Sequence, residues 1–206
     1  MERNSYTATI KLYSYIASPY WPELDDLINI QKKSGVNRAK SEGKRELALK
    51  SYLKQEGISE EHYFELLDKS SRQWYTNDDG KIIVPRHQLA GCLVQSVGMA
   101  PAAVRGKFDK DSFRHYVRLS DFTTEKVKPD TVFDRYVKNE ATNQRRRTIN
   151  GVIENFEAVG TVEIDSKFKL KDFDNLLTFA LSECGLGGCR KMGYGRGEIS
   201  TMKQVE

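Results

Sequence analysis

Two long stretches of the chain alternate apolar and polar residues, which is the pattern of a β-strand with one buried face. Residues 6–17 place Ala8, Ile10 and Leu12 on one face, with threonines and a lysine on the other. Residues 152–164 form the second run, and Gly160 within it predicts a β-bulge. Shorter β-like runs cover residues 81–85, 113–122, 131–137 and 198–202. These patterns predict a sheet of several strands.

Other segments repeat apolar residues at helical spacing. Residues 170–184 place Phe173, Leu177 and Leu181 on one side, and residues 88–97 show a similar pattern, so both predict helices that pack on the sheet. Three further helical segments cover residues 23–31, 46–56 and 59–71.

The order of these elements predicts the fold class. Without the extra helices, the order is strand, strand–helix, strand hairpin, helix and strand, which fits an α+β fold with a ferredoxin-like βαββαβ core, the frame of RNA-recognition domains. At 206 residues the chain fits one domain. We therefore expect a single RRM-like domain, residues 1–206, with a helical insertion at about 23–72 and a protruding, thumb-like β-hairpin at about 131–160.

Composition changes this picture little. The net charge of +4 permits a nucleic-acid partner without requiring one. No run approaches the roughly 18 apolar residues that span a membrane, and residues 1–6 lack the apolar core of a signal peptide. The three cysteines have no zinc-site spacing. We expect a cytoplasmic protein with reduced thiols, no metal site and no membrane partner.

The chain's glycines concentrate in residues 185–197, which hold six of the 15 together with three basic residues. Such a loop offers backbone N–H groups and positive charge to an anion. The alternative is a helix C-cap at Gly185 followed by a surface loop. The candidate RNA-binding residues here are Gly187, Gly188, Arg190, Lys191, Tyr194 and Arg196.

A second candidate anion site lies at the start of the helix at residues 88–97. The strand at 81–85 ends in a proline, and Arg86, His87 and Gln88 then open the helix, where N–H groups and the helix dipole favour an anion. The alternative is a simple cap with a surface arginine.

The run at 113–122 is expected to be a strand with a functional face. Arg114, Tyr116 and Arg118 alternate on one side, and this mixture of cations and an aromatic ring is typical of an RNA surface. His115 falls on the opposite, apolar side, where a hydrogen-bonded core histidine is expected.

The hairpin tip and one pair of carboxylates complete the candidates. Arg145, Arg146 and Arg147 lie in a long, acid-poor tip, so we favour phosphate binding over a merely solvated run.

Asp25 and Asp26 are adjacent and could hold Mg²⁺ for phosphodiester cleavage. They also fit the acidic first turn of a helix. No cofactor is expected unless the protein is a nuclease.

Several motifs follow one another along residues 80–202. They are IIVPRHQLAGCLVQ, then LSDF, TVFDRYVKNEATNQRRR and IENFEAVGTVEI, and finally GLGGCRKMGYGRGEI. In this order they resemble the backbone subunits of the CRISPR-associated RAMP superfamily, of the type III (Csm/Cmr-like) or type I kind. The sequence departs from the family pattern at Arg86, His87 and Ala90, where the family has small polar residues and lysine.

The resemblance implies a subunit that grips a guide RNA within a multi-subunit effector ribonucleoprotein, and our first hypothesis is that this subunit is non-catalytic. Arg86, His87, Gln88 and the loop at 187–196 would meet the guide backbone. Residues 133–147, which include Arg135, would form a thumb that interrupts guide–target pairing. The implied partners are guide RNA, a complementary target nucleic acid, copies of the same chain and other effector subunits. Two alternatives stay open: a metal-dependent endoribonuclease, or a solitary homologue that sequesters guide RNA or blocks effector assembly.

Overall fold

The computed structural model describes residues 2–17, 21, 23–36, 38–39, 41–139 and 144–205, with the backbone alone at residues 112, 135–139 and 144–146. The chain forms two compact units. The first, called the sheet unit, comprises Met1–Ala17, Trp74–Asp130 and Val152–Glu206. The second, called the helical unit, comprises Ser18–Gln73 and Thr131–Gly151.

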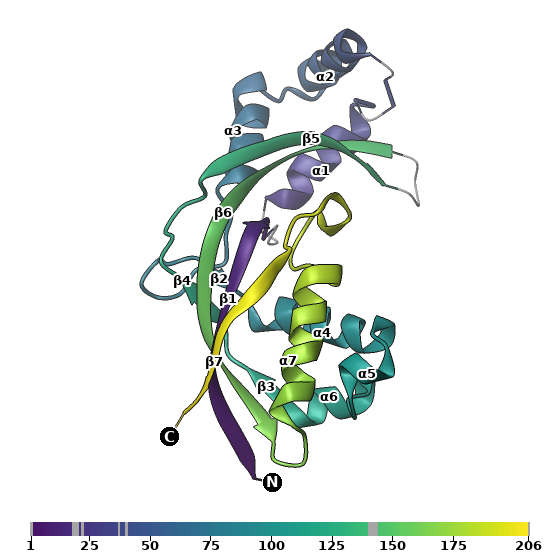
Figure 1. Cartoon of the computed structure of the whole chain (residues 1–206). Coiled ribbons are helices and arrows are strands. Elements are labelled where there is room, and N and C mark those ends of the chain that lie inside the picture. The colour runs from purple at the N-terminus through teal and green to yellow at the C-terminus, as the bar shows by residue number, and fades with distance from the viewer. Residues whose placement is uncertain are drawn as a thin grey trace. The chain divides into compact units, whose positions relative to one another are not determined.

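The described residues form a seven-stranded sheet (Figure 1). Its main path runs β2-β4-β6-β1-β7, and β3 and β5 also pair with β6. The pairs with a defined register are antiparallel. The strands are β1 (Arg3–Tyr15), β2 (Ile83–Val84), β3 (Val117–Leu119), β4 (Phe122–Thr124), β5 (Thr131–Asn139), β6 (Gln144–Asp165) and β7 (Gly197–Gln204).

Strands β1 and β6 form the centre of the sheet unit, and their alternation matches the prediction. Ile10 pairs with Ala158 and Leu12 with Phe156, and all four side chains are buried on one face. The register with β1 is constant from one end of the pairing to the other, so no bulge interrupts this pairing at Gly160. On the opposite edge of β6, the register shifts by one residue between β3 and β4, at the level of Gly160. A steric contact explains why residue 160 is a glycine: a Cβ atom at this position would lie 2.4 Å from Cδ2 of the Phe122 ring.

The helices of the sheet unit lie along one face of the sheet (Figure 1). They are α4 (Arg86–Met99), α5 (Ala102–Arg105), α6 (Lys110–Tyr116) and α7 (Leu170–Phe179), which continues as a π-helical turn, η1 (Ala180–Cys184). Leu89 and Leu93 of α4 and Phe173 and Leu177 of α7 join the sheet in one hydrophobic core. Burial of these apolar side chains is what stabilises the layer.

The topology confirms the predicted α+β class. Strands β1 and β3 are both antiparallel to β6, so they run parallel to each other, with α4 in the connection between them. Strands β6 and β7 are both antiparallel to β1, with α7 between them. Two such split β-α-β connections are compatible with a ferredoxin-like core that carries insertions.

The strand predicted over residues 113–122 is wrong in its first half. Helix α6 covers residues up to Tyr116, and β3 begins only at Val117. Phe113 and Val117 are both buried, and their spacing of four fits a helix as well as a strand. His115 is exposed on this helix and is not a core residue. Arg114 therefore lies on a helix and Arg118 on a strand, and the two do not share a strand face.

The helical unit contains α1 (Leu24–Lys33), α2 (Glu42–Glu56) and α3 (Glu60–Ser71), close to the predicted helical segments. Its separate core is built from the apolar sides of these helices, with Leu27, Leu53 and Leu67 among the buried side chains. Ser59 caps α3, because its hydroxyl accepts a hydrogen bond from His62 N at 3.1 Å. Within the described residues, no helix has the length and apolar character that crossing a membrane requires.

The three free cysteines differ in burial, and this leads to a prediction. Cys92 and Cys184 are buried, whereas Cys189 is half-exposed. Burial raises the pKa of the Cys92 thiol to about 12. Because the thiolate is the reactive form and each pKa unit changes its population tenfold, we expect Cys92 to react about 1,000-fold more slowly than an ordinary thiol. Mass spectrometry of peptides labelled with a thiol reagent at pH 8 measures this. Equal labelling of Cys92 and Cys189 without denaturant would contradict it.

Candidate nucleic-acid interface

The glycine-rich loop, residues 185–197, is tied to the end of β1 by backbone hydrogen bonds. Gly188 N donates to Ile16 O at 2.7 Å, Gly195 N donates to Ser14 O at 2.6 Å, and Tyr13 N donates to Arg196 O at 2.9 Å. The loop also closes on itself, since Leu186 N donates to Gly195 O at 2.9 Å. It is thus an ordered extension of the sheet unit.

Two glycines show why the loop has this composition. Gly187 has φ +69°, and a Cβ atom there would lie 2.3 Å from Ile16 O. Gly195 has φ +76°, and its Cβ atom would lie 1.9 Å from Leu186 O. These two glycines are therefore required by close contacts within the chain itself. The basic side chains of the loop remain as the groups that can meet a ligand.

These basic side chains have different surroundings. The Arg190 guanidinium donates a hydrogen bond to Gln95 Oε1 of α4 at 2.8 Å. The Arg196 guanidinium donates to Ser182 O, which holds it against the end of the π-helical turn. Lys191 is exposed and Tyr194 half-buried. Arg190 thus connects the loop with α4.

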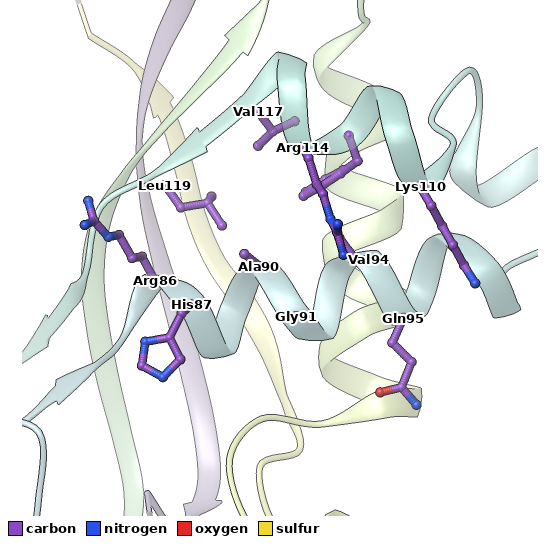
Figure 2. Close-up of a pocket in the computed structure, with 11 residues that line it drawn as sticks. Arg86, His87, Ala90, Gly91, Val94, Gln95, Lys110, Arg114, Val117 and Leu119 are labelled. Atoms are coloured by element: carbon purple, nitrogen blue, oxygen red, sulfur yellow. The ribbon is translucent and has the colours of Figure 1, made fainter. Parts of the chain in front are cut away.

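A groove of about 640 Å³ lies between α4 and α6 in the sheet unit. Figure 2 shows Lys110 and Arg114 extending from α6 toward α4. Arg86 and His87 stand at the other end of the groove, at the start of α4. Of the described residues that line the groove, none is acidic; the remaining ones are Ala90, Gly91, Val94, Gln95, Phe113, Val117 and Leu119.

The groove's cations have defined positions. Lys110 crosses over Gly98 of α4, where a Cβ atom would lie 2.6 Å from Lys110 Cε. Lys110 and Arg114 are four residues apart on α6, so they lie on the same side of the helix. Arg86 and Arg114 are exposed. This arrangement of positive charges over a concave surface favours a polyanion.

The start of α4 is partly occupied by the chain's own groups. Arg86 N donates to the Asp121 carboxylate at 2.7 Å, so a carboxylate already takes a place that the sequence assigns to an anion. The ring of His87 packs edge-on against Tyr75. Gln88 uses its amide within the fold: Oε1 accepts from the Tyr15 hydroxyl at 2.6 Å and Nε2 donates to Ala17 O at 3.2 Å.

The other predicted residues lie elsewhere. The Arg118 guanidinium on β3 lies 4.0 Å from the carboxylate of Glu163 on the neighbouring strand β6, measured from Nη1 to Oε2. In the helical unit, Arg147 forms an ion pair with Asp134 in which both carboxylate oxygens accept, at 3.0 and 2.5 Å. The side chains of Arg135, Arg145 and Arg146 lie outside the described residues.

Asp25 and Asp26 occupy the first turn of α1, and both are exposed. Acidic residues in a first turn stabilise a helix through its dipole. Across the described parts of the chain, no group of three or more His, Cys, Asp or Glu side chains is arranged to hold a metal ion.

Two polar residues of the groove, Lys110 and Gln95, are not indicated as site residues by the sequence. Lys110 belongs to the pair Lys110–Arg114, whose spacing of four is informative only on a helix, and the sequence pattern predicts a strand from residue 113. No sequence pattern indicates a role for Gln95, because what distinguishes it is its hydrogen bond with Arg190, which only the folded structure shows.

Comparisons with known proteins add the following. No family model matches the sequence, and no curated protein matches it. Among solved structures, the chain is similar to a chain in the cryo-EM structure of the type III-B Cmr-beta bound to cognate target RNA, with a TM-score of 0.48 and 11% sequence identity. The similarity covers 100% of this chain and 61% of that one, so this chain spans less than two thirds of its length.

Proposed function

We propose that this chain is a guide-RNA-binding backbone subunit of a multi-subunit effector ribonucleoprotein, and that it grips the RNA backbone without reading its sequence. Copies of the chain and other effector subunits are the proposed protein partners, and a complementary nucleic acid pairs with the bound guide. The guide, as the particular RNA, rests on the resemblance of the motifs in residues 80–202.

The groove between α4 and α6 carries the proposal. Cations from both helices face it, and none of the described lining residues is acidic. Through Gln95, the groove also meets Arg190 of the glycine-rich loop. The phosphates of an RNA lying along the groove and the loop would be neutralised by several basic side chains. Phosphate contacts of this kind do not depend on the RNA sequence.

RNA binding as a function of salt tests the proposal. We expect single-stranded RNA to bind with a log Kd that rises linearly with log salt, with a slope of about 0.7 for each phosphate neutralised. Arg190→Gln is expected to lower both the affinity and this slope, because one cation is removed. Lys203→Gln is the matched control, since this exposed lysine lies on β7 and is not part of the groove. Fluorescence anisotropy with labelled RNA measures both quantities.

Mass measurements on the same complexes test the proposed assembly. A subunit that coats a guide should add copies stepwise as the RNA is lengthened, through head-to-tail contacts. One copy per RNA at every length would instead favour a solitary chain that sequesters RNA. Absence of RNA binding by the wild-type protein at low salt would refute the proposed function as a whole.

A further inference from the structure

The groove between α4 and α6 has a second property that a plain phosphate track does not need: much of its lining is apolar. Val94 of α4 and Leu119 of β3 contribute apolar surface to the groove, and the buried Phe113 of α6 lies behind it. Val94 and Leu119 are only partly buried. The groove therefore combines a water-accessible apolar surface with a positively charged rim.

The middle of α4 provides an independent observation. Gly91 lines the groove and is exposed, and a Cβ atom placed on it would have no heavy atom within 4 Å. Glycine in a helix interior is unfavourable compared with alanine. Among the described residues, no packing contact requires glycine here, unlike at Gly98, over which Lys110 lies. The small size of residues 90 and 91, an alanine and a glycine that form the floor of the groove, is explained if another molecule occupies the space above them (Figure 2).

We propose that the groove holds a single nucleotide of the bound RNA, with its base against the apolar wall and its phosphate at Lys110 and Arg114. This inference rests on the proposed function and specifies one contact within it. A base offers a flat apolar face to partly exposed side chains such as Val94 and Leu119, and the adjoining phosphate is a suitable partner for the cations on α6. The volume of about 640 Å³ lies within the range that small ligands occupy.

Charge and shape favour a nucleotide over an acidic peptide. A peptide carboxylate could pair with Arg114 or Lys110, but an acidic peptide would make no contact with the apolar wall or with the surface at Gly91. A nucleotide places an apolar ring and an anion side by side, as the groove does. Gln95, at the groove's edge, already accepts from Arg190, so a cation of the glycine-rich loop stands next to the same space.

The test uses the full-length protein labelled with ¹⁵N and titrated with adenosine 5′-monophosphate, uridine 5′-monophosphate, ribose 5-phosphate, inorganic phosphate and an acidic hexapeptide. Both nucleotides are expected to shift the backbone amide signals of Gly91 and Val94, and to bind about tenfold more tightly than ribose 5-phosphate because of base contacts. Equal affinity for ribose 5-phosphate and the nucleotides would overturn the inference. So would shifts caused by an acidic hexapeptide but not by the nucleotides.

Two variants and a control make the test specific. Gly91→Leu fills the floor of the groove and should abolish the nucleotide-induced shifts, while the helix keeps or gains stability in a thermal melt because leucine is the better helix former. Arg114→Gln should weaken nucleotide binding about tenfold by removing a charged partner. Lys128→Gln, an exposed lysine outside the groove, should change neither measurement.

The same variants separate this inference from the proposed function. RNA should bind Gly91→Leu about tenfold more weakly than the wild-type protein if a nucleotide enters the groove. If Gly91→Leu binds RNA with unchanged affinity and salt slope, the inference is wrong and the proposed function stands. If the wild-type protein binds no RNA, the proposed function is wrong whatever the nucleotides do.

Discussion

Replacing Gly195 by alanine is expected to lower the free energy of unfolding of the sheet unit by about 3 kcal/mol. The new Cβ atom would lie 1.9 Å from Leu186 O, so one of the two segments must move. Such a movement breaks the hydrogen bonds Gly195 N–Ser14 O and Leu186 N–Gly195 O, each worth about 1 kcal/mol. The left-handed backbone at φ +76° adds about 1 to 2 kcal/mol for any residue with a Cβ atom.

Gly193→Ala is the matched control for this prediction. Gly193 also has a positive φ, +90°, but no heavy atom lies within 4 Å of the position of its Cβ atom. We therefore expect only the conformational cost, about 1 kcal/mol. Urea denaturation followed by far-UV circular dichroism measures both variants. Equal destabilisation of the two would show that the contact with Leu186 does not determine the composition of the loop.

The Gly195→Ala variant should also bind RNA more weakly, because the loop holds Arg190 beside the groove. In the Gly193→Ala variant, we expect the hydrogen bonds from Gly188 N to Ile16 O and from Gly195 N to Ser14 O to be retained, so its affinity should stay close to that of the wild-type protein. Affinity would be measured well below the melting temperature of each variant. This separates loss of the loop's position from loss of the fold.

The fold could be predicted where one hydrophobic period dominated the sequence. Strand β1 has buried residues at every second position from Tyr6 to Leu12, and α7 has them at helical spacing, so both elements could be predicted. Residues 113–122 could not be assigned in this way, because Phe113 and Val117 fit both periods. In the structure, the Phe113 ring packs against Phe108, and the chain pairs with β6 only from Val117 onward.

The candidate site was predicted only in part, for a related reason. The positive charge of the glycine-rich loop and of the start of α4 is visible in the sequence. The concave surface between α4 and α6 depends on two helices meeting, and Lys110 and Arg114 become neighbours only once α6 exists. Gly160 shows the same limit, since its reason is the ring of Phe122, which lies on another strand.

Gln88 is the residue for which the motif resemblance and the structure predict different experiments. The resemblance implies that Gln88 meets the guide backbone. In the structure, its amide accepts from the buried Tyr15 hydroxyl and donates to Ala17 O, which connects the start of α4 with the end of β1. Burial also raises the pKa of Tyr15, so its hydroxyl keeps the proton that it donates.

Gln88→Ala is therefore expected to lower the free energy of unfolding by about 2 kcal/mol, because it leaves a buried hydroxyl without a partner. Tyr15→Phe should cost less, about 1 kcal/mol, since the half-buried amide of Gln88 can turn toward water. The double variant should be more stable than the sum of the single effects implies, because neither unpaired group remains. Urea denaturation followed by the fluorescence of Trp74, whose ring centroid lies 5.8 Å from that of Tyr15, measures all three.

RNA affinity then decides between the two roles of Gln88. If its amide serves mainly to join α4 to β1, Gln88→Ala should change the dissociation constant less than about threefold, whereas Arg86→Gln at the exposed end of the groove should raise it about tenfold. A loss of affinity in Gln88→Ala as large as that in Arg86→Gln, with an unchanged melting temperature, would support direct contact with the RNA backbone. The same result would mean that the hydrogen bond to Tyr15 is exchanged for one to phosphate when RNA binds.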